Sequence, residues 1–427
     1  MRTLLAICIF AALPSFAQES SLAGTWKGSM IREGVALPVS VTFSTDGATF
    51  SSPRQRALDI PLRNVRTEGD AVHFELVGDA TTIVFDGKVA ADSLSGTFRE
   101  GAAAGEVRFK RAPADAATYR VEDARFNNGA VTLAGSFLVP QGKGPHPAVI
   151  FLHGSGAEGR AASRFVADRF ARAGVAALIY DKRGVGQSTG DWRASGFEDL
   201  VADAVAGVDW LRNRGDIRRG QIAVYGHSQG GMLAPFVASS TPHVQFVISG
   251  AGSAVPLREA EVNSIVNQLR ARGVAESDMA AAAAYVHRYV GALATGAYSA
   301  EFAAETEKVK TASWFPHVRV PSADHWFWRY YARIANYDAS AHWRKVTVPA
   351  LVMYGEADLY VPVQRSVANI DRALQQAQNR DYTLVVFPRA SHAFDIEPPR
   401  DGPFEWPRVA PGFPELAIAW LRERLRE

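Results

Sequence analysis

The sequence contains a single cysteine, Cys8, among its 427 residues. Cys8 lies in an N-terminal apolar stretch that we expect to be removed, so the mature chain would hold no cysteine at all. That excludes disulfides, thiolate metal ligands and a cysteine nucleophile. A protein without disulfides depends on its hydrophobic core, and a chain of this length with 47% apolar residues is able to build one.

The chain also has no long run of charge of either sign. Lys and Arg number 46 against 44 Asp and Glu, which gives a formal net charge of +2. The short arginine clusters "IRRG" and "LRERLRE" are typical of solvated loop and helix ends. We therefore expect neither a nucleic acid partner nor binding to an anionic membrane.

The apolar run at the N-terminus is too short to span a bilayer. The opening "MRTLLAICIFAALPSFAQES" has one positive charge, an apolar stretch over 4–13 and then the triplet "SFA", which ends at Ala17. This pattern predicts a secretory signal peptide over 1–17, cleaved after Ala17. Cys8 follows Ile7 rather than a small residue, which argues against a lipid-anchored cysteine. We expect a periplasmic or secreted protein without a membrane anchor.

The motifs of metal and nucleotide sites are missing as well. There is no HExxH, and the ten histidines are scattered along the chain, which argues against a metal site. The segment "DKRGVGQSTGD" has the glycines of a phosphate loop but lacks both the Gly-Lys-Ser/Thr ending and the GxGxxG spacing before a helix. We expect no metal and no cofactor.

From Leu22 to about Lys110 the chain consists of short alternating segments, among them "LPVSVTFSTDGATF" and "AVHFELVGD". Alternation with a period of two, interrupted by Asp-Gly and Gly-Asp turns, predicts antiparallel β-structure. We expect a β-rich accessory domain over 18–112, either a lipocalin-like barrel or a sandwich. "LAGTWKGSM" is similar to the opening strand of lipocalin-like barrels. Whether the domain binds a ligand or glycan, or only packs on its neighbour, stays open.

After the predicted linker "RAPADAATYR" the pattern changes, and over 113–427 buried strands alternate with amphipathic helices. This alternation predicts an α/β domain with a mostly parallel sheet and helices on both faces, whose ligands bind at the carboxyl ends of the strands. Over about 254–345 the alternation stops, and we expect a helical cap insertion there. We expect most of its aromatic residues to pack the cap and one or two of them also to line a substrate pocket. The aromatic residues concerned include Trp314, Phe315, Trp326, Phe327 and Trp328.

The stretch "VYGHSQGGM" places Ser228 between Gly226 and Gly230, after the apolar run "QIAVY" and before the helical "MLAPFVASS". A strand, a tight turn and a helix with serine at the apex form the nucleophile elbow Gly-x-Ser-x-Gly. The glycines are required because the turn is strained and neighbouring chain packs closely around it. Ser228 is therefore the candidate nucleophile.

A serine nucleophile requires a base, and the base requires a carboxylate that orients it. His392 follows the last predicted strand in "FPRASHAF", and Asp358 follows the preceding strand in "MYGEADLYVP". The order Ser228, Asp358, His392 is the one that goes with this elbow. Glu356 and Asp395 stay open as alternatives for the acid. The other candidates for the base lie beside the serine or in the insertion: His227, His287, His317, His325 and His342.

The tetrahedral intermediate of acyl transfer needs hydrogen-bond donors for its oxyanion. We expect one donor to be the backbone amide of Gln229, directly after the nucleophile. The other would come from "HGSG", from Ser155 or its neighbour Gly156. His153 begins that loop and is expected to brace it rather than to act in catalysis.

From about Tyr119 to its end the chain resembles the α/β-hydrolases, with "HGSG", "DKRGVGQS", "GHSQGG", "GEAD" followed by "VPV", and "ASHAF" in the order of that superfamily. "GHSQGG" and "DKRGVGQSTG" are similar to the dienelactone hydrolase, serine aminopeptidase and acylaminoacyl-peptidase-like branch, in which many secreted bacterial members are carboxylic ester hydrolases. The resemblance implies an α/β-hydrolase fold with Ser228 as nucleophile, His392 as base and Asp358 as acid. A Pro- and aromatic-rich segment after His392, "DIEPPRDGPFEWPRVAPGFP", departs from simple members, and we expect it to cover the base.

The leading hypothesis is accordingly a serine carboxylic ester hydrolase that acts through an acyl-enzyme on small-molecule esters with small or aromatic acyl groups, without a cofactor. The alternative is a serine peptidase of aminopeptidase or dipeptidyl type with the same triad, in which Glu259 and Glu261 would hold the substrate's amino group. A non-catalytic binding protein on the same scaffold is disfavoured because the triad is complete. The natural ester and the oligomeric state stay open.

Overall fold

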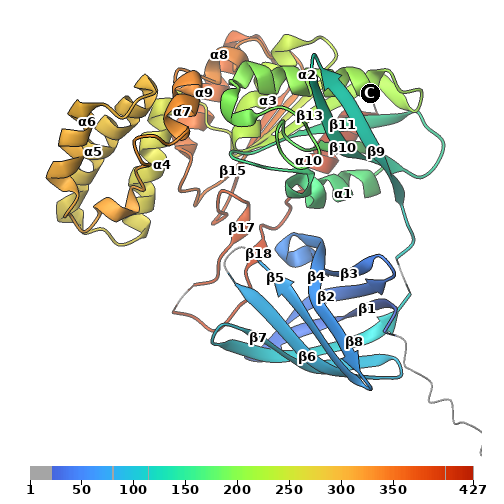
Figure 1. Ribbon diagram of the computed structural model, residues 1–427. Coiled ribbons are helices and arrows are strands. Elements are labelled where there is room, and N and C mark those ends of the chain that lie inside the picture. The colour runs from blue at the N-terminus through green and yellow to red at the C-terminus, as the bar shows by residue number, and fades with distance from the viewer. Residues whose placement is uncertain (1–21, 79–80, 114, 400, 427) are drawn as a thin grey trace, which may run out of the picture. The chain divides into compact units, whose positions relative to one another are not determined.

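The computed structural model describes residues 22–78, 81–113, 115–399 and 401–426. The chain divides into two compact units, Met1–Asp115 and Ala116–Glu427, each built around its own sheet (Figure 1). The predicted signal peptide over 1–17 lies outside the described residues. Within them, no helix is long and apolar enough to cross a membrane.

The first unit is a closed antiparallel barrel, in which each strand pairs with the next and the last pairs with the first. Sequence alternation with a period of two produces this architecture because it turns one side of every strand inward. Of the two predicted alternatives, the barrel is confirmed. The strands are β1 (Gly24–Arg32), β2 (Val35–Ser44), β3 (Gly47–Ser52), β4 (Ala57–Glu68), β5 (Ala71–Val77), β6 (Thr82–Ala90), β7 (Ser93–Glu100) and β8 (Ala103–Ala112), with the short helix η1 (Pro53–Gln55) before β4.

Buried aromatic side chains fill the inside of the barrel. Phe43 of β2 contacts Phe74 of β5 with ring centroids 5.7 Å apart, although β2 and β5 are not neighbours in the sheet. Phe74 in turn stacks on Phe85 at 4.7 Å. The fully buried Trp26 lies under the guanidinium of Arg111, 4.3 Å from its ring centroid. These contacts give the barrel a core of packed aromatic side chains.

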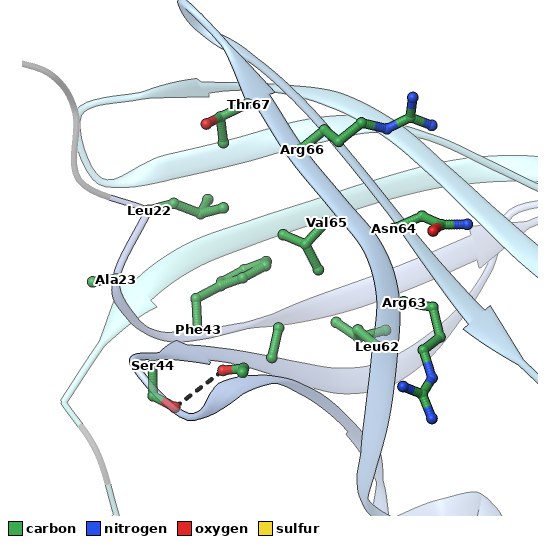
Figure 2. Close-up of a pocket in the computed structure, with 12 residues that line it drawn as sticks. Leu22, Ala23, Phe43, Ser44, Leu62, Arg63, Asn64, Val65, Arg66 and Thr67 are labelled. Atoms are coloured by element: carbon green, nitrogen blue, oxygen red, sulfur yellow. Dashed lines mark hydrogen bonds between the residues drawn. The ribbon is translucent and has the colours of Figure 1, made fainter.

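A pocket of about 660 Å³ lies at one end of the barrel, where β4 runs on beyond its pairing with β3. Phe43, Leu62 and Val65 point into this space, whereas the side chains of Arg63 and Arg66 extend to the other side of β4 (Figure 2). The wall that β4 contributes is thus apolar inside and basic outside. The apolar packing of the barrel centre continues to this end.

The second unit is built on an eight-stranded sheet with the order β16-β15-β14-β13-β11-β12-β10-β9. The pairs from β16 through β12 are parallel, and β10 and β9 extend the sheet with antiparallel pairing. The central strands are apolar almost throughout because both of their faces are covered. The strands are β9 (Tyr119–Asn128), β10 (Val131–Pro140), β11 (His146–Leu152), β12 (Ala176–Tyr180), β13 (Ile217–His227), β14 (Phe246–Gly250), β15 (Ala350–Gly355) and β16 (Tyr382–Phe387).

Helices cover both faces of this sheet (Figure 1). One face carries α1 (Arg164–Arg172) and α10 (Glu415–Arg424). The other carries α2 (Phe197–Arg212), α3 (Gln229–Ser240), α8 (Ser340–Trp343) and α9 (Val363–Gln376), whose buried side chains share one core with the sheet. The predicted fold class, a mostly parallel sheet between helices after a smaller β-domain, is confirmed.

Between β14 and β15 the chain leaves the sheet and forms a group of helices beside it (Figure 1). These are α4 (Leu257–Ala271), α5 (Glu276–Thr295), α6 (Ala300–Val309), the short η4 (Phe315–His317) and α7 (Phe327–Ile334). They enclose a core of their own, in which Tyr285, Trp314 and Trp328 are at most 3% exposed. Trp314 and Trp328 therefore pack the insertion, the role expected for most of its aromatic residues.

A buried ion pair joins the loop after β12 to α2. The guanidinium of Arg183 donates to both carboxylate oxygens of Asp203 at 2.7 Å and to Ser195 Oγ at 3.0 Å. Arg183 is 6% exposed and Asp203 1% exposed. The hydrogen bonds to Asp203 raise the pKa of Arg183, so the guanidinium stays charged. The ion pair thus attaches the glycine-rich segment "DKRGVGQSTGD" to α2, one of the helices that cover the sheet.

We predict that Arg183→Met lowers the free energy of unfolding by about 3–5 kcal/mol, because it leaves the carboxylate of Asp203 buried without its cation. Urea denaturation followed by circular dichroism measures the change. Lys308→Met is the matched control, since Lys308 of α6 is 67% exposed where it pairs with Glu305, and its loss is expected to cost no more than about 1 kcal/mol. Equal and small effects of the two substitutions would contradict the prediction.

Candidate active site

Ser228 alone makes the turn between β13 and α3. β13 ends at His227 and α3 begins at Gln229. Ser228 has φ +57° and ψ −118°, a conformation that L-residues rarely adopt and that costs on the order of 1–3 kcal/mol. The backbone around the turn must therefore hold it in place.

Two glycines allow the neighbouring backbone to do so. A Cβ atom on Gly226 would lie 2.0 Å from the carbonyl oxygen of Gly230, and one on Gly230 would lie 2.7 Å from the carbonyl oxygen of Leu152. Neither position has room for a side chain. The amide of Ser228 also donates to the carbonyl of Gly250 on β14 at 2.8 Å. The turn is thus clamped by three neighbouring segments at the carboxyl end of the sheet.

The structure brings the three predicted triad residues together. Oδ2 of Asp358 lies 2.7 Å from Nδ1 of His392, and Nε2 of His392 lies 2.8 Å from Oγ of Ser228. Because a carboxylate only accepts hydrogen bonds, Nδ1 carries the hydrogen and Nε2 is free to accept from the serine hydroxyl. Oδ1 of Asp358 accepts the amides of Tyr360 and Val361 at 2.7 and 3.0 Å. The buried carboxylate is held by donors on both oxygens and fixes the imidazole in turn.

The alternative acids and bases do not take these places. Glu356 accepts the amide of Arg389 at 2.8 Å, and Asp395 begins the two-residue strand β17 (Asp395–Ile396), which pairs with β18 (Arg408–Val409). His342 stacks on Phe236, with ring centroids 3.8 Å apart. Among the described residues, no group of three or more His, Cys, Asp or Glu side chains is placed to hold a metal ion.

His227 has a position that the sequence did not predict. Its Nε2 donates to the backbone carbonyl of His392 at 2.9 Å, and the two rings lie 5.1 Å apart. The ring of Phe394 lies 6.0 Å from that of His227. His227 thus supports the loop that carries the candidate base, and its place directly before Ser228 was the only signal for this in the sequence.

The two predicted oxyanion donors lie in adjoining segments. Gln229 is the first residue of α3, and the first amides of a helix have no acceptor within the helix and carry its partial positive charge. Ser155 is exposed in the loop after β11, the strand beside β13. The backbone at Gly230 approaches the carbonyls of Leu152 and His153, so this loop and the start of α3 are in contact.

His153 braces the same loop. Its Nε2 donates to the carbonyl of Tyr180 at 2.5 Å, and the two rings lie edge to face at 4.4 Å. Loss of hydration, together with the nearby ammonium of Lys182, lowers the pKa of His153 to about 3. The ring is therefore neutral at ordinary pH and takes a structural position.

Comparison with known families matches residues 143–399 to the family described as serine aminopeptidase, S33. This match covers more than half of the chain. The chain belongs to this family of α/β-hydrolases. The matched residues include β11, the elbow at Ser228, and His392.

Individual relatives are more distant. Esterase EstD of Thermotoga maritima is 26% identical over 236 residues, which are 54% of this chain and 50% of that protein. The chain spans about half the length of the curated relatives it matches. Among solved structures, an esterase of Pyrococcus furiosus is 17% identical with a TM-score of 0.45, over 72% of this chain and 91% of that one. A dienelactone hydrolase of Anabaena variabilis is 20% identical with a TM-score of 0.40, over 72% and 99%.

We predict that Gly226→Ala abolishes the elbow geometry, because the new methyl group would collide with the Gly230 carbonyl. The variant should fail to react with a fluorophosphonate probe at Ser228, as measured by mass spectrometry, and should unfold at lower temperature. Gly220→Ala is the matched control on the same strand, since a Cβ there meets nothing within 4 Å. Normal labelling of the Gly226 variant would show that the close approach is not required.

Proposed function

We propose that the protein is a serine carboxylic ester hydrolase that works through an acyl-enzyme. The observation that carries this proposal is the hydrogen-bonded chain from Ser228 through His392 to Asp358, placed on a strained elbow at the carboxyl end of the sheet. Family membership and the likeness to an esterase support it.

In the acylation step, His392 Nε2 accepts the proton of the Ser228 hydroxyl while Oγ attacks the ester carbonyl carbon. The carbonyl oxygen gains the negative charge and accepts hydrogen bonds from the amides of Gln229 and Ser155. Asp358 holds the imidazole in the tautomer that this transfer needs and favours its charged form. When the tetrahedral intermediate collapses, His392 donates the proton to the departing alcohol.

Deacylation repeats these steps with water. His392 removes a proton from the water molecule as its oxygen attacks the acyl carbon. The same amides hold the second oxyanion, and collapse returns the proton to Ser228 Oγ and releases the carboxylic acid. No cofactor takes part in either half of the reaction.

The surface next to His392 supports small or aromatic acyl groups as substrates. Leu359 and Tyr360 follow the candidate acid directly and are 42% and 48% exposed. The ring of Tyr360 lies 5.0 Å from that of His392. Exposed apolar side chains beside a nucleophile offer contact to an apolar part of the substrate.

The surroundings of the two cap carboxylates favour an ester over a peptide substrate. Glu259 forms an ion pair with Arg365 of α9. Burial raises the pKa of Glu261, which disfavours its anionic form. Neither group is thus a ready partner for a substrate's ammonium, as the aminopeptidase alternative would require.

The signal-peptide pattern over 1–17 leads us to propose that the protein acts in the periplasm or outside the cell.

We predict that Ser228→Ala lowers kcat on p-nitrophenyl esters by at least about 10³-fold with an unchanged melting temperature, because it removes the hydroxyl that His392 would deprotonate. Asp358→Asn should cost a comparable factor, since His392 would lose its orienting anion. Aminoacyl and dipeptidyl p-nitroanilides measured in parallel test the alternative. Faster turnover of the anilides would replace the esterase by a peptidase, and full activity of Ser228→Ala would remove the triad assignment.

We predict that Tyr360→Ala lowers kcat/KM for p-nitrophenyl benzoate relative to p-nitrophenyl acetate by about 2- to 10-fold, the worth of one lost aromatic contact. The two substrates share their leaving group, so the ratio reports on the acyl side alone. Val386→Ala, which truncates another exposed apolar residue, is the control. An unchanged ratio would place the acyl group away from Tyr360.

A further inference from the structure

The buried ammonium group of Lys182 contacts both the loop and the helix start that carry the proposed oxyanion donors. Lys182 is the second residue after β12 and is 1% exposed. Its Nζ donates to the carbonyl of Gly154 at 2.6 Å, to the carbonyl of Gly156 at 2.7 Å and to Oε1 of Gln229 at 3.4 Å. The ring centroid of Trp192, on η3 (Trp192–Ala194), lies 5.6 Å away. A buried charge of this kind is tolerated because three oxygens and an aromatic ring replace its water.

The bond to Gly154 determines where the next amide points. In a trans peptide the carbonyl and the following N–H lie in one plane and point in opposite directions. The carbonyl of Gly154 points to the buried Nζ, so the N–H of Ser155, an exposed residue, points away from the ammonium group. The amide of Gly154 itself is held at 2.6 Å by the carboxylate of Glu158. Both sides of Gly154 are thus fixed, and with them the Ser155 donor.

The bond to Gln229 connects this loop with the other donor. Gln229 accepts from Lys182 through Oε1 and donates through Nε2 to the hydroxyl of Tyr330 on α7 at 3.3 Å. Its backbone begins α3, which contacts the loop at Gly230. One ammonium group therefore spans the two segments that supply the proposed oxyanion amides.

We propose that Lys182 is a positioning residue that sets the Ser155 and Gln229 amides at the spacing an oxyanion requires. This inference rests on the proposed function, in which those amides stabilise the tetrahedral intermediate. Lys182 does not touch the substrate; it acts through the two peptide groups above it. Since the intermediate uses these amides more strongly than the bound ester does, loss of Lys182 acts on kcat rather than on KM.

The surroundings of Lys182 make its effect depend on pH. Burial lowers the pKa of Lys182 to about 8, and Glu158 opposes this shift. The other groups that face Lys182 do not change their charge near pH 8. His153 is neutral there, and Asp181 is an anion paired with Arg160. Trp192 and Gln229 contribute an aromatic ring and a side-chain amide, which do not titrate. Above pH 8 the amine keeps two hydrogens for three acceptor oxygens, so at least one of the bonds is lost. Positioning is therefore complete well below pH 8, is half lost near pH 8 and weakens further as the pH rises.

The test compares Lys182→Met, which keeps the length of the side chain without its donors, with wild type and with Lys143→Met, an exposed lysine in the loop before β11. At pH 7 we expect Lys182→Met to lower kcat on p-nitrophenyl acetate by about 10- to 100-fold, below the loss from deleting an oxyanion donor outright. KM should stay within about threefold. Affinity for phenylboronic acid, which forms an anionic tetrahedral adduct with the serine, should fall with kcat. Lys143→Met should match wild type.

The pH profile provides a second test, and its wild-type measurement requires no variant. Wild-type kcat should fall between pH 8 and 9.5, and Lys182→Met, or Lys182→Arg if the former does not fold, should lack this decline. Unchanged kcat and boronate affinity in Lys182→Met, or a rise in KM alone, would overturn the inference while Ser228-dependent turnover of wild type preserved the proposed function. If wild type hydrolysed no ester and bound no boronate, both would fall together.

Discussion

The close approach of backbone to backbone around Ser228 is the constraint on which the site depends. Gly226 and Gly230 touch with no room for a β-carbon, and Gly230 rests on the loop after β11 in the same way. This contact forces the serine into its unusual conformation and at the same time brings the start of α3 against the segment that carries Ser155. The nucleophile and the proposed oxyanion donors are therefore set by one packing event rather than by separate ones.

The remaining parts of the site reach the same edge because parallel strands all end there. Asp358 follows β15 and His392 follows β16, and the hydrogen bond between these two residues joins their loops. His227 connects the loop of His392 to the end of β13. Two charged residues after β12 also stabilise this edge of the sheet. Lys182 supports the oxyanion loop and Arg183 anchors the turn to α2. The bonds of Lys182, Arg183, His227 and His392 to groups on other elements hold this edge in place.

Much of this arrangement was predictable from the sequence because it depends on local patterns. Apolar runs ending in glycine-rich turns marked the strands, and the elbow, with Asp358 and His392 in order after it, marked the triad. Contacts between distant segments left no such signal. Barrel and sandwich have the same period of two, so only the pairing of β1 with β8 separates them. The predicted linker runs into β9 at Tyr119, since a strand at the sheet edge is polar on its exposed side. No sequence pattern singled out Lys182, because nothing in a single sequence shows that a lysine is buried.

The helices between β14 and β15 pack around their own aromatic core, which Tyr285, Trp314 and Trp328 form without residues of the sheet. Although α7 also contacts the core of the sheet through Tyr330 and Ile334, most of the insertion packs on itself and is free to change in sequence while the sheet keeps its register. For the proposed esterase, a change confined to this insertion is therefore a route to a different acyl substrate. The chemistry stays with the strands, and the insertion is the part that evolution, or a laboratory recombination experiment, is able to replace as a block.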